Sequence, residues 1–286
     1  MDIAYLNGTF LPLAKAKISV LDRGFLFAES VYEVIPVYAG SAFLCDEHLA
    51  RLSHSLSGID LNLDKSHDAI KIIIDKVLKK NQALTGNCLI YLQVTRGAEP
   101  TRKHIYADYA KPSLFVTLLP FPKNHSTKGV KVITKQDRRG EQSDIKDNAK
   151  LYHTMDLKQA TKQGASEVIY IRQNRVTEAA SSNVFAVKNG VVYTPPKSSA
   201  ILTGITRNKI ISLLKENHVA INETDFTRDE LLCMDEVWLS ASSKEVIPIS
   251  TIDNKTFPIL TPSLYNKIKQ WYQQAATKCY VHTSND

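Results

Sequence analysis

Two basic side chains separated by one residue, Arg102 and His104, follow a strand-like stretch that ends at Arg96-Gly97. An arginine and an imidazole can together bind one carboxylate through charge-assisted hydrogen bonds, which fixes the orientation of the ligand. A second candidate is Lys146, because a lysine amine can form a Schiff base with an aldehyde and then move a proton as a general base. Considered alone, either feature is more often part of a solvated surface. Other segments of the chain are therefore needed to assign a binding or catalytic role to these residues.

Features that suit a phosphate group occur at three other places. Arg51 offers a guanidinium that can form paired hydrogen bonds with phosphate oxygens. Gly204-Ile205-Thr206 opens a predicted helix, where backbone amides point toward a bound anion and Thr206 adds a hydroxyl. Ser242, in a serine-rich turn, offers a further hydroxyl. Each of these residue types suits a phosphate group on its own.

The composition is that of a globular protein. Of the 286 residues, 43% are hydrophobic and 23% are charged, which excludes a disordered, collagen-like or coiled-coil chain. The length permits one large domain or two of medium size. The 36 basic and 29 acidic residues give a net charge of +7, but the basic residues are interspersed with acidic ones, so we expect no nucleic-acid partner.

The termini and cysteines exclude several further classes. The four cysteines include no CxxC pair, so neither a metal site nor a redox motif is expected. The sequence starts with no basic segment followed by an apolar core, and no stretch approaches the ~18 apolar residues of a membrane span. We therefore expect a cytoplasmic protein without a membrane partner.

The first half of the chain predicts strands and two helices. Asn7-Gly8 indicates a tight hairpin, and Ala39-Gly40-Ser41 a second one. Asp46 is expected to cap a helix, and the apolar spacing from Ile70 predicts another helix that ends near Lys80. Two further strands are expected at 88–95 and 113–119.

The second half follows a polar stretch that we interpret as an interdomain linker. We expect a small N-terminal domain at 1–120, the linker at 121–129 and a C-terminal domain at 130–286. A helix is expected from Lys146 to about Lys162. Further strands are predicted, together with a helix that starts near Arg207; the strands lie at 130–134, 167–171, 183–187, 191–193 and 237–240. The pattern indicates an α+β fold in two lobes, with antiparallel hairpins in each.

Several segments, in this order, resemble the fold-type IV pyridoxal-phosphate aminotransferases, and most closely their D-amino-acid transaminase branch. The resemblance covers nearly the whole chain and rests on Val31-Tyr32-Glu33-Val34-Ile35, Glu47-His48-Leu49-Ala50-Arg51-Leu52, Val94-Thr95-Arg96-Gly97, Asp144-Ile145-Lys146, Val176-Thr177-Glu178, Ser181-Ser182-Asn183-Val184-Phe185 and Gly204-Ile205-Thr206-Arg207. It implies a smaller N-terminal α/β lobe, a larger C-terminal lobe with an antiparallel β-rich core, and pyridoxal 5'-phosphate between them.

The resemblance also implies roles for single residues around this cofactor. Lys146 would form the Schiff base and transfer the proton, and Glu178 would keep the pyridine nitrogen protonated. Arg51, Ile205, Thr206 and Ser242 would bind the phosphate, while Ser182 and Arg139 would lie in the cofactor site. Tyr32, Arg102 and His104 would bind the substrate α-carboxylate.

The implied reaction is a ping-pong exchange in which a D-amino acid, D-alanine first of all, gives its amino group to 2-oxoglutarate and yields pyruvate and D-glutamate. The resemblance implies a homodimer in which each site borrows a loop from the second subunit. A branched-chain L-amino-acid aminotransferase and an aminodeoxychorismate lyase are the alternatives within the family, and a non-enzymatic basic binding protein is a remote one. Arg102 and His104 argue against the first two.

Three departures from the family pattern bear on these roles. Lys150, four residues after Lys146, stands where relatives usually carry an apolar or aromatic residue. If both lysines were on one helix they would share a face, and the second charge would lower the pKa of Lys146. Ala179-Ala180 removes a hydroxyl near the cofactor, and Thr101 resembles an insertion that could displace Arg102.

Overall fold

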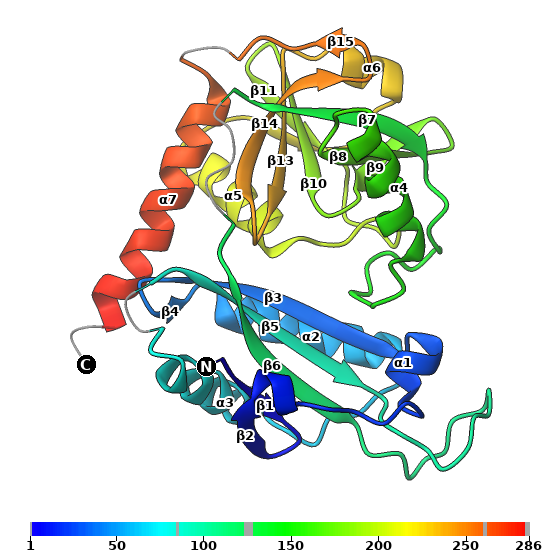
Figure 1. The fold of residues 1–286 in the computed structure, drawn as a ribbon. Helices are drawn as coiled ribbons and strands as arrows, with labels where there is room; N and C mark the ends of the chain where they lie inside the picture. The colour runs from blue at the N-terminus through cyan, green and yellow to red at the C-terminus, as the bar shows by residue number, and fades with distance from the viewer. Residues whose placement is uncertain (1, 84–85, 123–127, 260–261, 284–286) are drawn as a thin grey trace. The chain divides into compact units, whose positions relative to one another are not determined.

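The computed structural model describes residues 2–83, 86–122, 128–259 and 262–283 (Figure 1). They divide into two compact units, the first made of residues 1–121, 145–149 and 276–286, the second of residues 122–144 and 150–275. Both units combine helices with a sheet, which confirms the predicted α+β class. The central part of the expected linker, residues 123–127, lies outside the described residues.

The first unit is built on a six-stranded antiparallel sheet in the order β2-β1-β6-β5-β3-β4. Its strands are β1 (Ile3–Leu6), β2 (Thr9–Pro12), β3 (Ser30–Tyr38), β4 (Ser41–Ala42), β5 (Cys88–Thr95) and β6 (Ser113–Pro120). Both predicted hairpins are confirmed. Asn7 and Gly8 adopt φ angles of 47° and 98°, the positive values that a two-residue hairpin loop requires.

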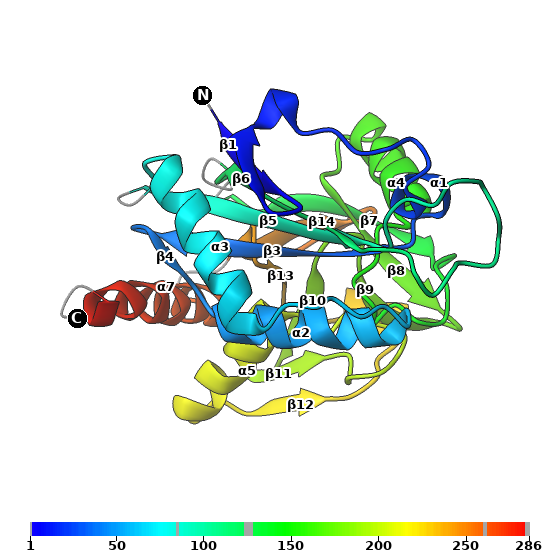
Figure 2. The same ribbon diagram turned by 90° about the horizontal axis from the view of Figure 1, so that it is seen from below.

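Two long helices, α2 (Cys45–Gly58) and α3 (His67–Lys80), pack on one face of this sheet (Figure 2). Their buried side chains recur every three or four residues, as in Ile70, Ile73 and Val77, so an apolar stripe faces the sheet. The expected cap at Asp46 was wrong by two residues. Leu44, in the left-handed conformation, is the N-cap residue of α2. Asp46 lies in the first turn, where its negative charge interacts favourably with the helix dipole.

Two short helices complete this unit: η1 (Leu13–Lys15) and α1 (Arg23–Phe27). The side chain of Asp22 caps α1 by accepting a hydrogen bond from the Gly24 amide at 2.8 Å. Helix α1 ends at Ala28, which has a φ of 57° and turns the chain into β3.

The second unit contains a nine-stranded sheet in the order β12-β11-β10-β13-β14-β7-β8-β9, with β15 paired to β14. Its strands are β7 (Val130–Gln136), β8 (Glu167–Arg172), β9 (Arg175–Ala179), β10 (Asn183–Lys188), β11 (Val191–Thr194), β12 (Ile221–Glu223), β13 (Glu236–Ala241), β14 (Glu245–Ile252) and β15 (Lys255–Thr256). Most neighbouring strands are antiparallel, but β7 runs parallel to both β8 and β14, and β11 runs parallel to β12. These strands therefore need connections longer than a hairpin, and α4 lies in one of them.

The remaining helices are α4 (Leu151–Lys162), α5 (Ile205–Glu216), α6 (Arg228–Leu232) and α7 (Leu264–Thr283). The expected start of α4 at Lys146 was wrong, because residues 145–149 form an irregular segment that hydrogen-bonds to the start of β3, with one bridge between Val31 and Asp147. The amide of Tyr32 donates to the carbonyl of Lys146 at 3.0 Å, and the amide of Asn148 donates to Ser30 at 3.2 Å. In the described part of the chain no helix is long and apolar enough to cross a membrane.

Candidate active site

Lys146 lies in the segment that pairs with the start of β3. Its amide donates to the Ser55 hydroxyl on α2 at 3.1 Å, and its Nζ lies 4.3 Å from the centroid of the Tyr32 ring. Ile145 packs at the end of α2, where a Cβ on Gly58 would come within 2.7 Å of it. The backbone on both sides of Lys146 is therefore fixed, and its half-buried amine lies against an aromatic ring.

The same unit buries an ion-pair cluster around Glu33. Arg51 donates to both oxygens of this carboxylate, with Nε–Oε1 and Nη2–Oε2 distances of 2.8 Å, and His48 Nδ1 lies 2.7 Å from Oε2. Glu33 is fully buried. Burial pushes its pKa upward, but the charge and hydrogen bonds of Arg51 and the contact with His48 outweigh that effect and hold the pKa well below its usual range. The guanidinium of Arg51 is therefore set rigidly in place.

Replacing Glu33 with glutamine is expected to lower the free energy of unfolding by about 3–5 kcal/mol at pH 7, because Arg51 would remain buried without its partner. Since the pKa of Glu33 is depressed in the folded state, its contribution is complete above its unfolded pKa of about 4.3 and is lost as the pH falls below that value. Denaturant titrations at pH 7, 5 and 3.5 should show the difference from wild type shrinking with pH.

The control is Glu47→Gln, an exposed glutamate in the first turn of the same helix, which should cost less than about 1 kcal/mol. A Glu33→Gln deficit that stays constant from pH 7 to 3.5 would contradict the assignment of the low pKa to Glu33.

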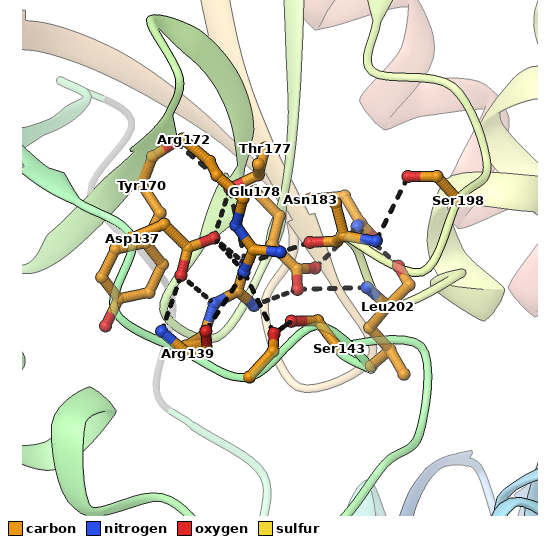
Figure 3. A network of polar contacts seen from close by, with 12 residues as sticks. Asp137, Arg139, Ser143, Tyr170, Arg172, Thr177, Glu178, Asn183, Ser198 and Leu202 are labelled. Carbon is orange, nitrogen blue, oxygen red and sulfur yellow. Dashed lines mark hydrogen bonds and ion pairs between the residues drawn. The ribbon is translucent and has the colours of Figure 1, made fainter.

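In the second unit, Glu178 at the end of β9 lies in a buried network of polar groups (Figure 3). Its Oε1 accepts from Arg139 Nη1 and from the amide of Leu202, the latter at 3.1 Å, and its Oε2 accepts from Asn183 Nδ2 at 3.2 Å. Glu178 is 5% exposed, so it is not a surface residue at a strand end. Burial raises its pKa, although the charge of Arg139 acts in the opposite direction. Such a carboxylate can hold a proton shared with a neighbouring base.

Arg139 does not face Glu178 alone. Its Nε and Nη2 donate to the two oxygens of Asp137, each at 2.9 Å, and Asp137 also accepts from Arg172 at 2.9 Å. Thr177, the neighbour of Glu178, donates to Asp137 at 3.1 Å. The positive charges of Arg139 and Arg172 are thus balanced by the negative charges of Asp137 and Glu178. The effect of Arg139 on the pKa of Glu178 is therefore partly offset by Asp137.

The start of α5 lies next to this network. Gly204 begins the helix with no side-chain cap, so no side chain competes for the first amides, those of Ile205 and Thr206 among them. A Cβ on Gly204 would lie 2.0 Å from Asn183 Oδ1, and Asn183 Nδ2 donates to the carbonyl of Leu202 at 2.8 Å. Asn183 therefore joins Glu178 to the helix start, a surface suited to a phosphate.

Ser182 and Ser242 lie in the loops that flank β10 and β13. The hydroxyls of Ser181 and Ser182 donate to the buried Glu167 at 2.6 and 3.4 Å. Lys244, two residues after the half-buried Ser242, pairs with the same carboxylate at 2.5 Å and donates to Ser181 at 2.7 Å. Glu167 thus ties the two loops to each other.

The three residues expected to bind the carboxylate lie in two places: Arg102 and His104 are near Phe27, whereas Tyr32 is near Lys146. Arg102 and His104 are exposed and contact one ring, that of Phe27, at 4.6 Å from the guanidinium carbon and 5.6 Å between ring centroids. Tyr32 instead lies beside Lys146 and Tyr91, with its ring centroid 5.9 Å from that of Tyr91. The structure therefore places Arg102 and His104 against the same ring and the phenol of Tyr32 beside Lys146.

Sequence reasoning did not single out Asn183, Asp137 or Glu33 as site residues. Asn183 directly follows Ser181-Ser182, and Asp137 lies two residues before Arg139, so their positions gave a weak signal. Their partners are far apart in sequence, however, and no pattern along the chain shows which buried acid meets which arginine. Among the described residues, no group of three or more histidine, cysteine or acidic side chains is arranged to hold a metal.

Comparison with known proteins gives a family for this arrangement. Residues 30–252 match the model of the amino-transferase class IV family. The chain is 39% identical over 252 residues to D-alanine aminotransferase of Bacillus licheniformis, covering 87% of this chain and 88% of the relative. A second D-alanine aminotransferase, from Staphylococcus epidermidis, is 36% identical over 257 residues, 89% of this chain and 90% of the relative.

The fold is also found in a solved structure with a different activity in its name. The branched-chain aminotransferase of Thermoproteus uzoniensis, crystallised with norvaline, superimposes with a TM-score of 0.90 at 24% identity, over 97% of this chain and 96% of that one. At this identity the likeness establishes the fold and leaves the substrate open.

Proposed function

This chain belongs to the class IV aminotransferases, and we propose that it transfers amino groups from D-amino acids to 2-oxo acids, with D-alanine and 2-oxoglutarate as substrates and pyruvate and D-glutamate as products. The observation that carries this proposal is the contact of both Arg102 and His104 with the Phe27 ring. An exposed guanidinium and an exposed imidazole that contact the same ring suit the α-carboxylate of an amino acid. The D-alanine aminotransferases at 34–39% identity support the same substrate class.

The cofactor of this family is pyridoxal 5'-phosphate, and the residues present fit it. When bound, it supplies the electron sink that makes the α-hydrogen of an amino acid acidic. The donor set offers an amine at Lys146, a buried carboxylate at Glu178 and an uncapped helix start at Gly204. These are the three groups that an aldehyde, a pyridine nitrogen and a phosphate require.

Within this proposal each residue has a distinct task. Lys146 would hold the cofactor through its aldehyde and would move the proton at the substrate α-carbon, while Glu178, beside Arg139, would keep the ring nitrogen protonated. Arg51, the backbone and hydroxyl groups at Ile205 and Thr206, and Ser242 would bind the phosphate, with Ser182 near it. Tyr32 joins Arg102 and His104 as a ligand of the carboxylate.

The substrates of an aminotransferase are amino acids and 2-oxo acids. We further propose that the enzyme works as a homodimer, in which the loop bearing Arg102 and His104 completes the site of the second subunit. The exposure of Arg102 and His104 in the single chain is consistent with such a role.

The test is the initial rate of amine transfer to 2-oxoglutarate from D-alanine and, separately, from L-leucine, for wild type and Arg102→Met. Wild type should use D-alanine, and Arg102→Met should raise the KM for D-alanine about 10- to 100-fold, since a hydrogen bond to a charged group contributes about 1.5–3 kcal/mol. Lys103→Met removes an equally exposed charge from the next position and should change KM less than about twofold.

Activity with L-leucine alone would show that the enzyme is a branched-chain L-amino-acid aminotransferase instead. Release of pyruvate from aminodeoxychorismate without amine transfer would show that it is the lyase. Equal KM values for Arg102→Met and Lys103→Met would show that Arg102 does not bind the carboxylate, as a displacement of the loop by Thr101 would predict.

A further inference from the structure

The buried side chain of Arg23 binds the backbone of the loop that carries Arg102 and His104. The side chain of Arg23 on α1 is 1% exposed. Its Nη1 donates to the carbonyl of Lys103 at 2.7 Å, and its Nη2 donates to the carbonyl of His104 at 2.9 Å. Two consecutive peptide groups of the loop therefore have a fixed position, and the side chains of Arg102 and His104 project from this fixed backbone.

Glu29 fixes the guanidinium of Arg23 in turn. It accepts from Arg23 Nε at 2.9 Å and from Arg23 Nη2 at 2.6 Å, and Glu99 lies 3.5 Å from Nη1. The same Glu29 accepts from Arg96 Nε at 2.6 Å. With its charge neutralised and its donors occupied, Arg23 stays in one orientation.

Helix α1 is itself attached to the end of β5. Asp22 accepts from the Thr95 hydroxyl at 2.8 Å, and the amide of Arg23 donates to the carbonyl of Gly97 at 2.8 Å. A Cβ on Gly24 would lie 2.5 Å from the Thr95 side chain, so the helix approaches the strand closely. Helix α1 is therefore fixed to β5 on one side and, through Arg23, to the loop on the other.

Phe27, at the last turn of α1, supports the side chains themselves. The guanidinium carbon of Arg102 lies 4.6 Å from its ring centroid, and that of Arg23 lies 4.7 Å from it. The ring of His104 lies against it at 5.6 Å with an interplanar angle of 45°. An aromatic face attracts a guanidinium at such distances and lowers the number of rotamers that a long exposed side chain visits.

We infer that Arg23 and Phe27 are positioning residues for substrate recognition: Arg23 fixes the backbone at Lys103 and His104, and Phe27 orients the side chains of Arg102 and His104 toward a carboxylate. This inference rests on the proposed function of Arg102 as a carboxylate ligand. Neither residue needs to touch the substrate. Their contribution is to order the guanidinium of Arg102 and the imidazole of His104 before the substrate arrives, which reduces the entropy lost on binding.

The test is Phe27→Leu, which keeps an apolar side chain but removes the aromatic face. It should raise the KM for D-alanine about 3- to 10-fold and change kcat less than about twofold, because the cation–π contact with Arg102 and the ordering of the His104 imidazole are lost together. The matched control is Phe25→Leu, the same substitution on the same helix at a ring that is 69% exposed, and its KM should match wild type.

Arg23→Lys is the second variant, since lysine keeps the charge but cannot hold two carbonyls and Glu29 together. The KM for D-alanine should rise in Arg23→Lys, as in Phe27→Leu, while kcat stays within about twofold of wild type. Because a buried arginine can also be needed for folding, Phe27→Leu remains the deciding variant if Arg23→Lys does not fold.

The double variant Phe27→Leu/Arg102→Met separates this inference from the proposed function. If Phe27 acts through Arg102, adding Phe27→Leu to Arg102→Met should raise KM less than it does in wild type. A large KM effect of Arg102→Met with no effect of Phe27→Leu would overturn the inference and leave the function standing. No KM effect of Arg102→Met would overturn the proposed function first.

Discussion

Replacing Lys146 with alanine is expected to reduce kcat with D-alanine and 2-oxoglutarate about 1000-fold or more, since a positioned general base alone contributes about 10²–10⁴-fold. The fixed backbone on both sides of Lys146 and the Tyr32 ring beside its amine leave no other described lysine in an equivalent place in the first unit. Borohydride reduction followed by peptide mass mapping should find the cofactor on Lys146 in wild type and on no residue of the variant.

Lys150→Ala is the matched control for this experiment. Lys150 is the residue before α4, and it belongs to the second unit, whereas Lys146 belongs to the first. We expect Lys150→Ala to keep the cofactor attached at Lys146 and to retain kcat within about tenfold, because burial, Arg139 and the Leu202 amide all affect the pKa of Glu178 more than the charge of Lys150 does. Attachment at Lys150 in wild type would contradict the assignment of Lys146.

Replacing Glu178 with glutamine is expected to lower kcat about 100-fold or more, because the loss of one preorganised electrostatic partner typically costs about 10²–10³ in kcat. Glutamine can still accept from Leu202, so the shape of the site should persist while the negative charge disappears. Turnover should therefore fall although the visible absorbance of bound cofactor remains. A Glu178→Gln enzyme that binds cofactor and turns over within tenfold of wild type would show that this carboxylate does not act on the ring nitrogen.

Local patterns predicted most elements of the fold correctly because the responsible interactions are short in sequence. Asn7-Gly8 forms its hairpin through two positive φ angles, and the apolar spacing from Ile70 correctly predicts that α3 ends at Lys80, although the helix already begins at His67. The wrong prediction that α4 starts at Lys146 has a long-range cause. Residues 145–149 pair with β3, more than a hundred residues away in the chain, and this long-range pairing overrides any tendency to continue α4 toward its N-terminus.

The site shows the same division between local and distant contacts. The residues that carry chemistry, such as Lys146, Glu178 and Arg102, could be selected from sequence because their segments resemble a family. The residues that hold them could not, since Arg23 meets the carbonyl of His104 across 81 residues and Asp137 meets Thr177 across 40. Buried ion pairs between such distant residues leave no periodic signal in the chain.

The most direct test of the central claim is the chirality of the amino acids consumed and formed. Purified enzyme with added pyridoxal phosphate would be incubated with racemic alanine and 2-oxoglutarate, and the alanine and glutamate enantiomers would be quantified by chiral chromatography. We expect that D-alanine is consumed, that D-glutamate appears in equal amount, and that L-alanine is unchanged. Consumption of L-alanine with formation of L-glutamate would contradict it.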